Sequence, residues 1–454
     1  IIQFILSVVL AVNVMLFNVL TSTYFLVLIG VLLILLGITL LTQIAAKGKG
    51  IGGKIFCILI CIILGVGSFY IGKVNNAFQK ITGRNKKKSS KVVAVKADDN
   101  ADTLSAAAEY TFGVQYATGG DQTKSAVKQI EKELGQNITL QEYSNLGEEA
   151  QALYDGEVDA IIYNSAYSNI IKEQYLTFTK DTKVIYKHNI VVEIESDTSD
   201  ESVTKPFAVY LSGIDTNGDI TEQGRSDVNI VAVVNPTSHQ VLLITTPRDY
   251  YVPIPGVSGG QDDKLTHAGI YGVDVSMQTL EALYDTDIEF FGRVNFTSMT
   301  SVVDALGGLD VESDLEFDTG WESGAEIHVN EGMNHFDGIS ALAFCRERQA
   351  LPDGDNGRGV HQQAVITAII KKMMSPAMLR GASDIIESVS DGVDTNFTSS
   401  QIQSLIKTQL RTNAKWNIYS VAADGTGGTD ICYSSGDEEL YVTYPNENSV
   451  AEII

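Results

Sequence analysis

Arginine is scarce in the acidic part of this chain and gathers in three short motifs. Residues 98–454 contain eight arginines, and five of them stand in the segments GRSDVN (Arg225), TPRDYY (Arg248) and CRERQALPDGDNGRGVHQQ (Arg346, Arg348 and Arg358). An arginine binds two phosphate oxygens at once through its planar donors, and it stays charged when water is removed. The three motifs therefore predict a binding site for an anionic ligand.

The spacing within the third motif predicts which of these side chains lie together. Arg358 and Gln362 are four residues apart at the start of an expected helix, so they share a face near the positive end of the helix dipole. Arg346 and Arg348 are two residues apart, which puts both on one side if the segment is extended. Structural ion pairing with the acidic residues of the same motif is an equally good interpretation.

Two carboxylates form a second candidate site. Asp215 ends the strand-like segment LSGID, and Asp227 follows Arg225 at the start of the next expected strand, so a turn between them brings both strand ends together. Such a pair suits Mg²⁺, which prefers few carboxylates together with water and phosphate oxygens. A turn formed by the Asp-Thr-Asn-Gly-Asp stretch explains Asp215 without any metal.

The segments around these motifs predict a layered fold with a central sheet. FAVYLSGIDT is typical of a strand that runs into a turn, and NIVAVVN and QVLLITT are typical of two strands of a hairpin. SMTSVVDALGG and GRGVHQQAVITAIIKKM predict helices, the first of them ended by Gly307 and Gly308. Residues 201–454 are therefore expected to form an α/β or α+β domain.

A smaller α/β domain is expected over residues 98–200. Strands and helices take turns there, at 110–117, 123–134, 138–143, 147–154 and 158–163. Alternation over such short lengths predicts a largely parallel sheet. The segment LYDGEVDAIIYN resembles part of a periplasmic-binding-protein half-domain. Because these residues contain no catalytic constellation, an accessory or partner-docking module is the favoured interpretation.

Three apolar stretches open the chain, at Ile1 to Leu20, Tyr24 to Ile44 and Ile55 to Ile71. We expect three transmembrane helices within residues 1–72, followed by a basic juxtamembrane linker over residues 73–97. The basic residues after the third stretch outnumber those before it, and this count favours a cytoplasmic soluble part. A polybasic segment that lies on anionic headgroups gives the same pattern, so the count leaves the orientation open.

The chain divides sharply by charge. Residues 1–97 contain eleven Lys and Arg and no acidic residue, which leaves 21 basic and all 56 acidic side chains in the rest of the chain. Such an acidic region repels nucleic acid, so no nucleic-acid partner is expected. Cys345 and Cys432 are either free thiols or one disulfide, and nothing in the cysteine spacing predicts zinc.

Taken together, the motifs LSGIDT, GRSDVNIVAVVN, LLITTPRDYYVPIPG, RVNFTSMTSVVDALGGLDV and RERQALPDGDNGRGVHQQ resemble the LytR-CpsA-Psr (LCP) family. Their order and spacing are similar to the family's. The three expected spans and the accessory domain are similar to family members that attach streptococcal capsule. The resemblance implies a Mg²⁺-dependent phosphotransferase that moves a glycan polymer, capsular polysaccharide in this case, from polyprenyl pyrophosphate to peptidoglycan.

The resemblance also implies a role for each candidate residue. Asp215 and Asp227 are similar to the family's Mg²⁺ ligands, and Arg225 to an arginine near the metal. Arg293 is expected at the edge of the pocket, and Asp249 is a candidate general base, although salt bridging explains Asp249 equally well. The residues expected to contact the pyrophosphate are Arg248, Arg346, Arg348, Arg358 and Gln362. The residues expected to take part in catalysis are Arg225, Arg248, Asp249, Arg346 and Arg348.

The resemblance further implies a multi-pass protein of the cell membrane with extracellular soluble domains. Its expected partners are the lipid-linked glycan, peptidoglycan, membrane lipid and other capsule-assembly proteins, and pyrophosphatase activity is an expected side reaction. An apolar pocket for the prenyl tail is expected along Val228, Ile230, Leu243 and the helix from Met299 to Leu306. The alternatives are a membrane-bound regulator and a noncatalytic lipid-binding scaffold.

Overall fold

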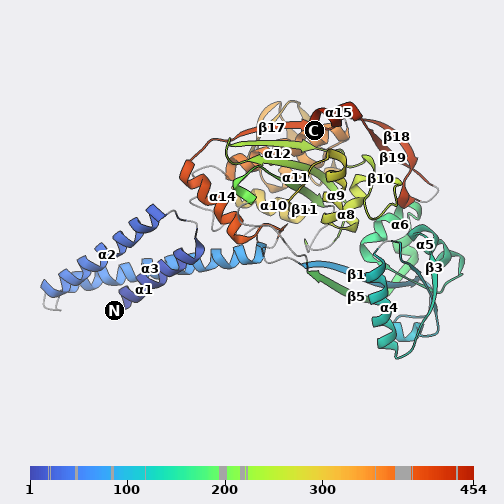
Figure 1. Ribbon diagram of the computed structural model, residues 1–454, viewed down its shortest axis with the longest axis horizontal. Helices are drawn as coiled ribbons and strands as arrows, with labels where there is room; N and C mark the ends of the chain where they lie inside the picture. Colours follow the sequence, from blue (N-terminus) through green and yellow to red (C-terminus); the bar gives the residue numbers. More distant parts are fainter. Residues whose placement is uncertain are drawn as a thin grey trace.

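The computed structural model describes residues 1–18, 20, 22–45, 50–82, 86–117, 119–193, 202–214, 220, 223–352, 354–373, 390, 392–435 and 438–454. In Figure 1 a group of N-terminal helices extends to one side of two folded domains. The smaller domain lies between these helices and the larger domain along the chain, and both domains contain a mixed sheet.

The N-terminal helices are α1 (Ile2–Phe17), α2 (Ser22–Ala45) and α3 (Ile51–Thr82). Their side chains are apolar on all sides, which is typical of helices that contact lipid. Two of them, α2 and α3, are long and apolar enough to cross a membrane, whereas α1 has 16 residues and is shorter than a typical span. Of the three predicted spans, two therefore correspond to helices with the length and composition of a span.

The accessory domain has a five-stranded sheet in the order β3-β2-β4-β1-β5. Alternate residues of β1 face opposite sides, so Val93 packs toward α4 and Val92 toward α5. The elements of this domain are β1 (Lys86–Lys96), β2 (Thr111–Gln115), α4 (Gly120–Leu134), β3 (Thr139–Tyr143), α5 (Leu146–Asp155), β4 (Ala160–Asn164), α6 (Ser168–Gln174), α7 (Phe178–Asp181) and β5 (Thr182–Glu193).

The accessory domain differs from the sequence prediction at its edges. The strands β2, β3 and β4 pair in parallel as expected, but β1 and β5 are antiparallel to their neighbours. β1 occupies the second part of the stretch for which a linker was predicted, and α3 occupies the first part as far as Thr82. The lysines of this stretch conceal the strand in the sequence, and long-range pairing with β5 stabilises it.

The larger domain is built on a six-stranded sheet in the order β16-β11-β6-β7-β8-β17. The hairpin predicted from NIVAVVN and QVLLITT is β7 and β8, which pair antiparallel. The strands are β6 (Phe207–Ile214), β7 (Ser226–Asn235), β8 (Gln240–Thr245), β11 (Phe290–Asn295), β16 (Val393–Thr395) and β17 (Asn417–Ala422). The domain therefore has the mixed α/β fold and the central sheet that the sequence predicts.

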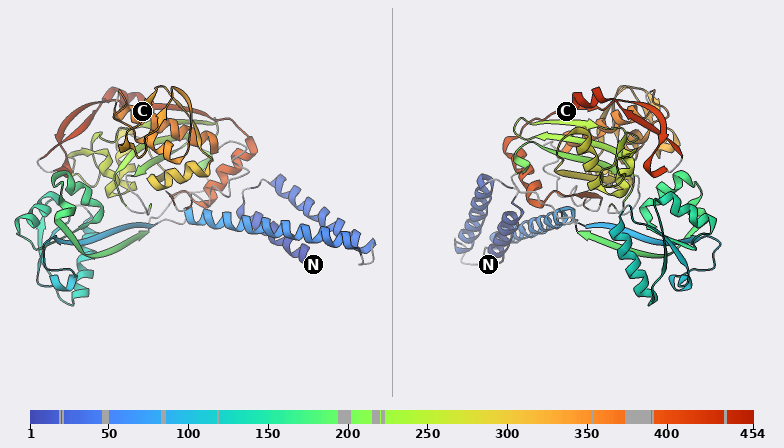
Figure 2. Two further views of the ribbon diagram at one scale, coloured as in Figure 1. Left: turned by 180° about the vertical axis from the view of Figure 1, so that it is seen from behind. Right: turned by 45° about the vertical axis from the view of Figure 1, so that its right-hand side comes forward.

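Helices cover both faces of this sheet (Figure 2). On one face Tyr210 and Val231 pack against α8 (Leu265–Tyr271) and α9 (Val273–Tyr284). On the other face Val209 and Leu243 pack toward α12 and α14. The helices of this second face are α10 (Phe296–Ala305), α11 (Gly338–Arg346), α12 (Asp355–Met373) and α14 (Ser399–Thr412).

Short elements complete the larger domain. Small antiparallel pairs flank the sheet. Cys345 and Cys432 are both buried, and neither forms a disulfide. The remaining elements are β9 (Tyr251–Pro253), β10 (Asp262–Lys264), β12 (Leu309–Ser313), β13 (Phe317–Asp318), β14 (His328–Val329), β15 (Gly332–Phe336), β18 (Gly425–Ile431), β19 (Glu439–Pro445) and α15 (Glu447–Ile453).

Candidate functional site

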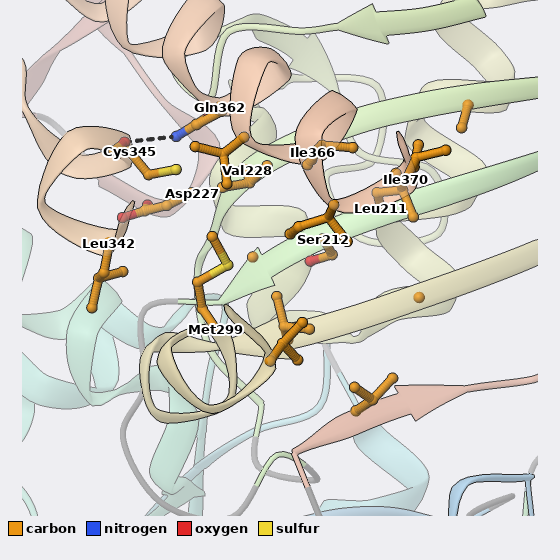
Figure 3. Close-up of a pocket in the computed structure, with 18 of the residues that line it drawn as sticks. Leu211, Ser212, Asp227, Val228, Met299, Leu342, Cys345, Gln362, Ile366 and Ile370 are labelled. Carbon is orange, nitrogen blue, oxygen red and sulfur yellow. Dashed lines mark hydrogen bonds between the residues drawn. The ribbon is translucent and has the colours of Figure 1, made fainter. Parts of the chain in front are cut away.

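A cavity of about 890 Å³ lies between the central sheet and the helices α10, α12 and α14. Most of its wall is apolar, and its polar side chains gather near the start of α12, where Arg358 and Gln362 lie (Figure 3). The cavity then follows α12 to Met373 at the end of that helix. At 1.5 Å per residue this part of α12 is roughly 22 Å long. The cavity therefore suits a ligand with an anionic end and a long apolar part.

The arginines of separate motifs meet at the polar end of this cavity. They come from the loop after β8, the end of α11 and the first turns of α12. The polar residues that line this end are Asp227, Arg248, Arg346, Glu347, Arg348, Arg358 and Gln362. The structure thus brings together four of the five arginines that the sequence motifs single out for an anionic ligand, the exception being Arg225.

Arg248 is held by carboxylates on two sides. Its Nη1 donates to Oδ1 of Asp227 at 2.9 Å, and its Nε lies 3.4 Å from Oδ2 of Asp249. Asp249 is buried, does not line the cavity and also pairs with Lys264, whose Nζ lies 3.6 Å from Oδ1. This placement favours a structural role for Asp249, which orients Arg248, over its proposed role as a general base.

Arg346 is positioned by an aromatic ring and a glycine. It is the last residue of α11, and its guanidinium lies over the ring of Phe296 with 4.4 Å between the guanidinium carbon and the ring centre. A Cβ on Gly324 would lie 3.1 Å from Nη1 of Arg346, so only a glycine leaves the guanidinium its present space. Stacking on a ring keeps the planar donors of Arg346 available to a ligand.

Glu347 fixes the backbone between the two arginines. One carboxylate oxygen accepts hydrogen bonds from the backbone N–H groups of Arg348 and Ala350, and the other accepts from the N–H of Gly320 and the hydroxyl of Ser323. Burial opposes ionisation of this carboxyl group, but the four hydrogen bonds outweigh burial and hold the pKa below its ordinary value. Glu347 therefore anchors the loop that presents Arg348, instead of pairing with an arginine side chain.

The start of α12 supplies Arg358 and Gln362, on one face as their spacing predicts. Nε2 of Gln362 donates to the backbone oxygen of Cys345 at 3.4 Å, which joins α12 to α11 (Figure 3). His361 stacks on the rings of both Phe344 and Phe317, which also stack on each other. Burial lowers the pKa of His361 to about 4, so this ring is neutral at neutral pH.

Two of the arginines singled out by sequence lie away from the cavity. Nη2 of Arg225 donates to the backbone oxygen of Asn169 in the accessory domain at 3.1 Å. Arg293 forms a buried ion pair with Asp394, with 2.6 Å between Nη2 and the carboxylate, while the cavity is lined by its neighbours in β11. These positions favour structural roles, the first of which joins the two domains.

The apolar wall matches the expected lipid pocket in part. Val228, Met299 and Leu306 line the cavity as expected, whereas Ile230 and Leu243 are buried in the neighbouring core. Sequence reasoning did not single out Phe296 or Glu347, nor the apolar side of α14. The spacing of Ile402, Leu405 and Ile406 is a signal for an inward helix face, but it does not distinguish a cavity wall from ordinary core.

Among the described residues, Asp227 fits the role of a metal ligand best. Its carboxylate faces the polar end of the cavity, and a carboxylate beside a phosphate site is a typical Mg²⁺ ligand. Asp215, the second expected ligand, lies outside the described residues. Within the described ranges no group of three or more His, Cys, Asp or Glu side chains is close enough to hold a metal ion. The donor chemistry of Asp227 thus fits Mg²⁺, and the rest of the coordination would come from phosphate and water.

Fold and site together define a membrane-anchored α/β protein with an arginine-lined, otherwise apolar cavity. The profile of the LytR_cpsA_psr family matches residues 163–448. The chain is 34% identical over 253 residues to the polyisoprenyl-teichoic acid–peptidoglycan teichoic acid transferase TagU of Bacillus cereus (strain AH820). The aligned region covers 56% of this chain and 77% of that protein. The chain therefore belongs to the LytR-CpsA-Psr family.

Two further proteins are similar to this chain. TagU of Enterococcus faecalis is 36% identical over 203 residues, or 44% of this chain and 65% of that protein. The crystal structure of B. subtilis TagV aligns with 55% of this chain and 94% of its own, at 26% identity and a TM-score of 0.47.

Proposed function

We propose that this chain transfers a glycan polymer from polyprenyl pyrophosphate to peptidoglycan on the outer side of the cell membrane. The observation that carries the proposal is the single cavity in which four arginines meet one end of a long apolar channel. A polyprenyl pyrophosphate has the same division, a compact dianionic group on a long hydrocarbon. The names of the TagU relatives, which describe transfer of teichoic acid to peptidoglycan, support the same reaction class.

In the proposed reaction a sugar hydroxyl of peptidoglycan attacks the phosphorus that carries the glycan. A new phosphodiester bond forms, the bond from that phosphorus to the bridging oxygen breaks, and polyprenyl phosphate leaves with the electron pair. The hydroxyl proton passes to solvent or to a phosphate oxygen, since Asp249 lies outside the cavity. Hydrolysis by water in place of the sugar would give the pyrophosphatase side activity.

The arginines of this chain lower the barrier by electrostatics. Arg346 and Arg348 stand at the end of α11 and can neutralise the charge that builds on the leaving phosphate. Arg358 adds its charge to the positive N-terminal end of the α12 dipole. Asp227 and Asp215 would hold Mg²⁺, which would supply further charge neutralisation when bound.

The polymer is proposed to be capsular polysaccharide, and teichoic acid is the alternative that the relatives suggest. The test uses the full chain in lipid nanodiscs, a radiolabelled lipid-linked glycan and isolated peptidoglycan. We expect label in the peptidoglycan with Mg²⁺, much less with a chelator, and a loss of about a hundredfold or more in Arg348→Ala. A chain that binds the lipid-linked glycan but never labels peptidoglycan would support the scaffold alternative and overturn the proposal.

A further inference from the structure

The helix α14 combines three features that no step of the proposed reaction uses. It covers the end of the cavity that is remote from the arginines, since Ile402, Leu405 and Ile406 line that end. It packs against the end of α3, the last of the anchor helices. It also belongs to a stretch that has basic residues and no carboxylate side chain, within a domain that is acidic as a whole.

The basic residues of α14 stand in a stretch without acids. Between Asp394 and Asp424 the chain has 29 residues without a single carboxylate side chain, although residues 98–454 contain 56. The cations of this stretch are Lys407 and Arg411, which share one side of α14, and Lys415, which follows the end of that helix at Thr412. Arg411 and Lys415 are exposed and Lys407 is half-buried, so the three charges are available to an anionic surface.

Contacts with the anchor place this basic side next to the membrane. The hydroxyls of Thr82 at the end of α3 and Ser399 at the start of α14 share a hydrogen bond of 2.6 Å. Nζ of Lys407 donates to Oδ1 of Asn18, just after α1, at 3.4 Å. Figures 1 and 2 both show α14 on the side of the larger domain that faces the anchor helices. A helix held at the ends of two anchor helices lies at the level of the lipid headgroups.

We propose that α14 rests on the anionic headgroups of the membrane through Lys407, Arg411 and Lys415. The larger domain is then seated with the remote end of its cavity against the bilayer and its arginines pointing away from it. This inference deepens the proposed function, because it gives the prenyl tail a direct route from the bilayer past Ile402 and Leu405 into the cavity. The docking itself stands on charge and on contacts with the anchor, and does not depend on catalysis.

The test measures hydrogen–deuterium exchange of α14 in the full chain, without any glycan substrate. The protein is placed in nanodiscs of phosphatidylcholine alone and in nanodiscs that contain phosphatidylglycerol. We expect exchange in α14 to be at least about fivefold slower in the anionic discs, which corresponds to the surface attraction of one basic residue. Equal exchange of α14 in the two kinds of disc would overturn the proposal.

A charge-reversed variant and a matched control test whether these three basic residues bind the anionic headgroups. The variant is Lys407→Glu, Arg411→Glu and Lys415→Glu, and we expect it to lose the effect of phosphatidylglycerol. The control reverses Lys124, Lys128 and Lys132, three exposed lysines with the same spacing on α4, and we expect it to keep the effect. If the reversed variant does not fold, the three-fold change to Gln takes its place. An effect that survives in the α14 variant would contradict the assignment.

Two further outcomes distinguish membrane docking from binding of the glycan polymer and from the proposed transfer reaction. A soluble anionic glycan polymer could slow the exchange of α14 in phosphatidylcholine discs while phosphatidylglycerol in the disc has no effect. That result would assign the basic side to the polymer and overturn membrane docking. Protection by phosphatidylglycerol in a chain that fails to transfer glycan would confirm docking while the proposed function fails. The two proposals are thus tested by different measurements.

Discussion

Asp227 and Arg248 meet at the polar end of the cavity, with 2.9 Å between Oδ1 and Nη1. Asp227 stands near the start of β7 and Arg248 lies just beyond the end of β8. Because the two strands are antiparallel, both side chains lie at the same end of the hairpin. Asp227 orients Arg248 but also competes with phosphate for it. This relationship makes Asp227 the sharpest test of the metal proposal.

Asp227→Asn is expected to separate binding from turnover. Loss of the negative charge frees Arg248 for phosphate, so binding of the lipid-linked glycan without Mg²⁺ should be unchanged or tighter. Transfer with Mg²⁺ should fall by about a hundredfold or more, because the proposed metal ion that stabilises the transition state loses a charged ligand. Binding and transfer are measured separately in nanodiscs, with Asp285→Asn, an exposed carboxylate after α9, as the control. Equal losses of binding and turnover would contradict this role.

The stacking of Arg346 on Phe296 gives a second prediction. Phe296→Leu keeps an apolar side chain but removes the ring, and Arg346 then loses about 0.5–1 kcal/mol of cation–π interaction. We expect the KM for the lipid-linked glycan to rise roughly two- to fivefold with a smaller change in kcat. Phe296→Tyr retains the ring face and serves as the control. A Leu variant with wild-type KM would show that the ring does not position Arg346.

Local spacing predicted the parts of the site that depend on one helix or one hairpin. Arg358 and Gln362 share a face because residues four apart always do so on a helix. Arg225, which the family resemblance places near the metal, donates instead to the accessory domain, and strand alternation does not extend to it. β7 begins at Ser226, and its register with β6 shifts between Gly213 and Ile214.

The remaining errors concern what surrounds a side chain after folding. Glu347 stands between two arginines in the sequence, which suggests an ion pair, yet one of its oxygens accepts from the backbone N–H of Gly320 and the hydroxyl of Ser323 in a distant loop. Arg293 is separated from the cavity by the alternation of β11, and its partner Asp394 is about a hundred residues away. Contacts of this range are set by the tertiary fold and leave no local pattern.

Glu347→Gln is expected to destabilise the larger domain at neutral pH by about 1–3 kcal/mol, since an amide cannot accept all four hydrogen bonds. The pKa of Glu347 lies below its ordinary value in the folded protein. Its contribution to stability is therefore present above the ordinary pKa of glutamate and is lost as the pH falls through the lowered value. The gap between wild type and variant should narrow below about pH 4.

Thermal unfolding of the full chain across this pH range measures the gap, and Glu312→Gln on the exposed side of β12 is the control. A gap that stays constant down to about pH 3 would show that ionised Glu347 does not stabilise the loop. The same variant should lower transfer at neutral pH, because the backbone that presents Arg348 loses its anchor.

His361 is expected to make stability depend on pH over a higher range than Glu347 does. Burial against two aromatic rings lowers its pKa to about 4, so the unfolded chain takes up a proton at a higher pH than the folded chain does. Stability should fall as the pH drops from about 6.5 to about 4, by up to about 3 kcal/mol. His361→Phe retains the stacked ring without a titrating group. The difference in unfolding temperature between wild type and this variant should change across that range, and a constant difference would refute the assignment.

A long prenyl tail passes through the remote end of the cavity, whereas a short tail does not reach it. Leu405 lines this end on α14, and Leu405→Trp fills space that a long prenyl chain needs. We expect the variant to transfer glycan from a short-chain carrier at the wild-type rate and from an undecaprenyl carrier at a reduced kcat/KM, because only the long tail reaches Leu405. Leu283→Trp, on α9 at the opposite face of the sheet, is the control for general effects of added bulk. Equal activity of the Leu405 variant with both carriers would mean that the tail does not occupy this end, and equal loss with both would mean that the substitution disturbs the arginines instead.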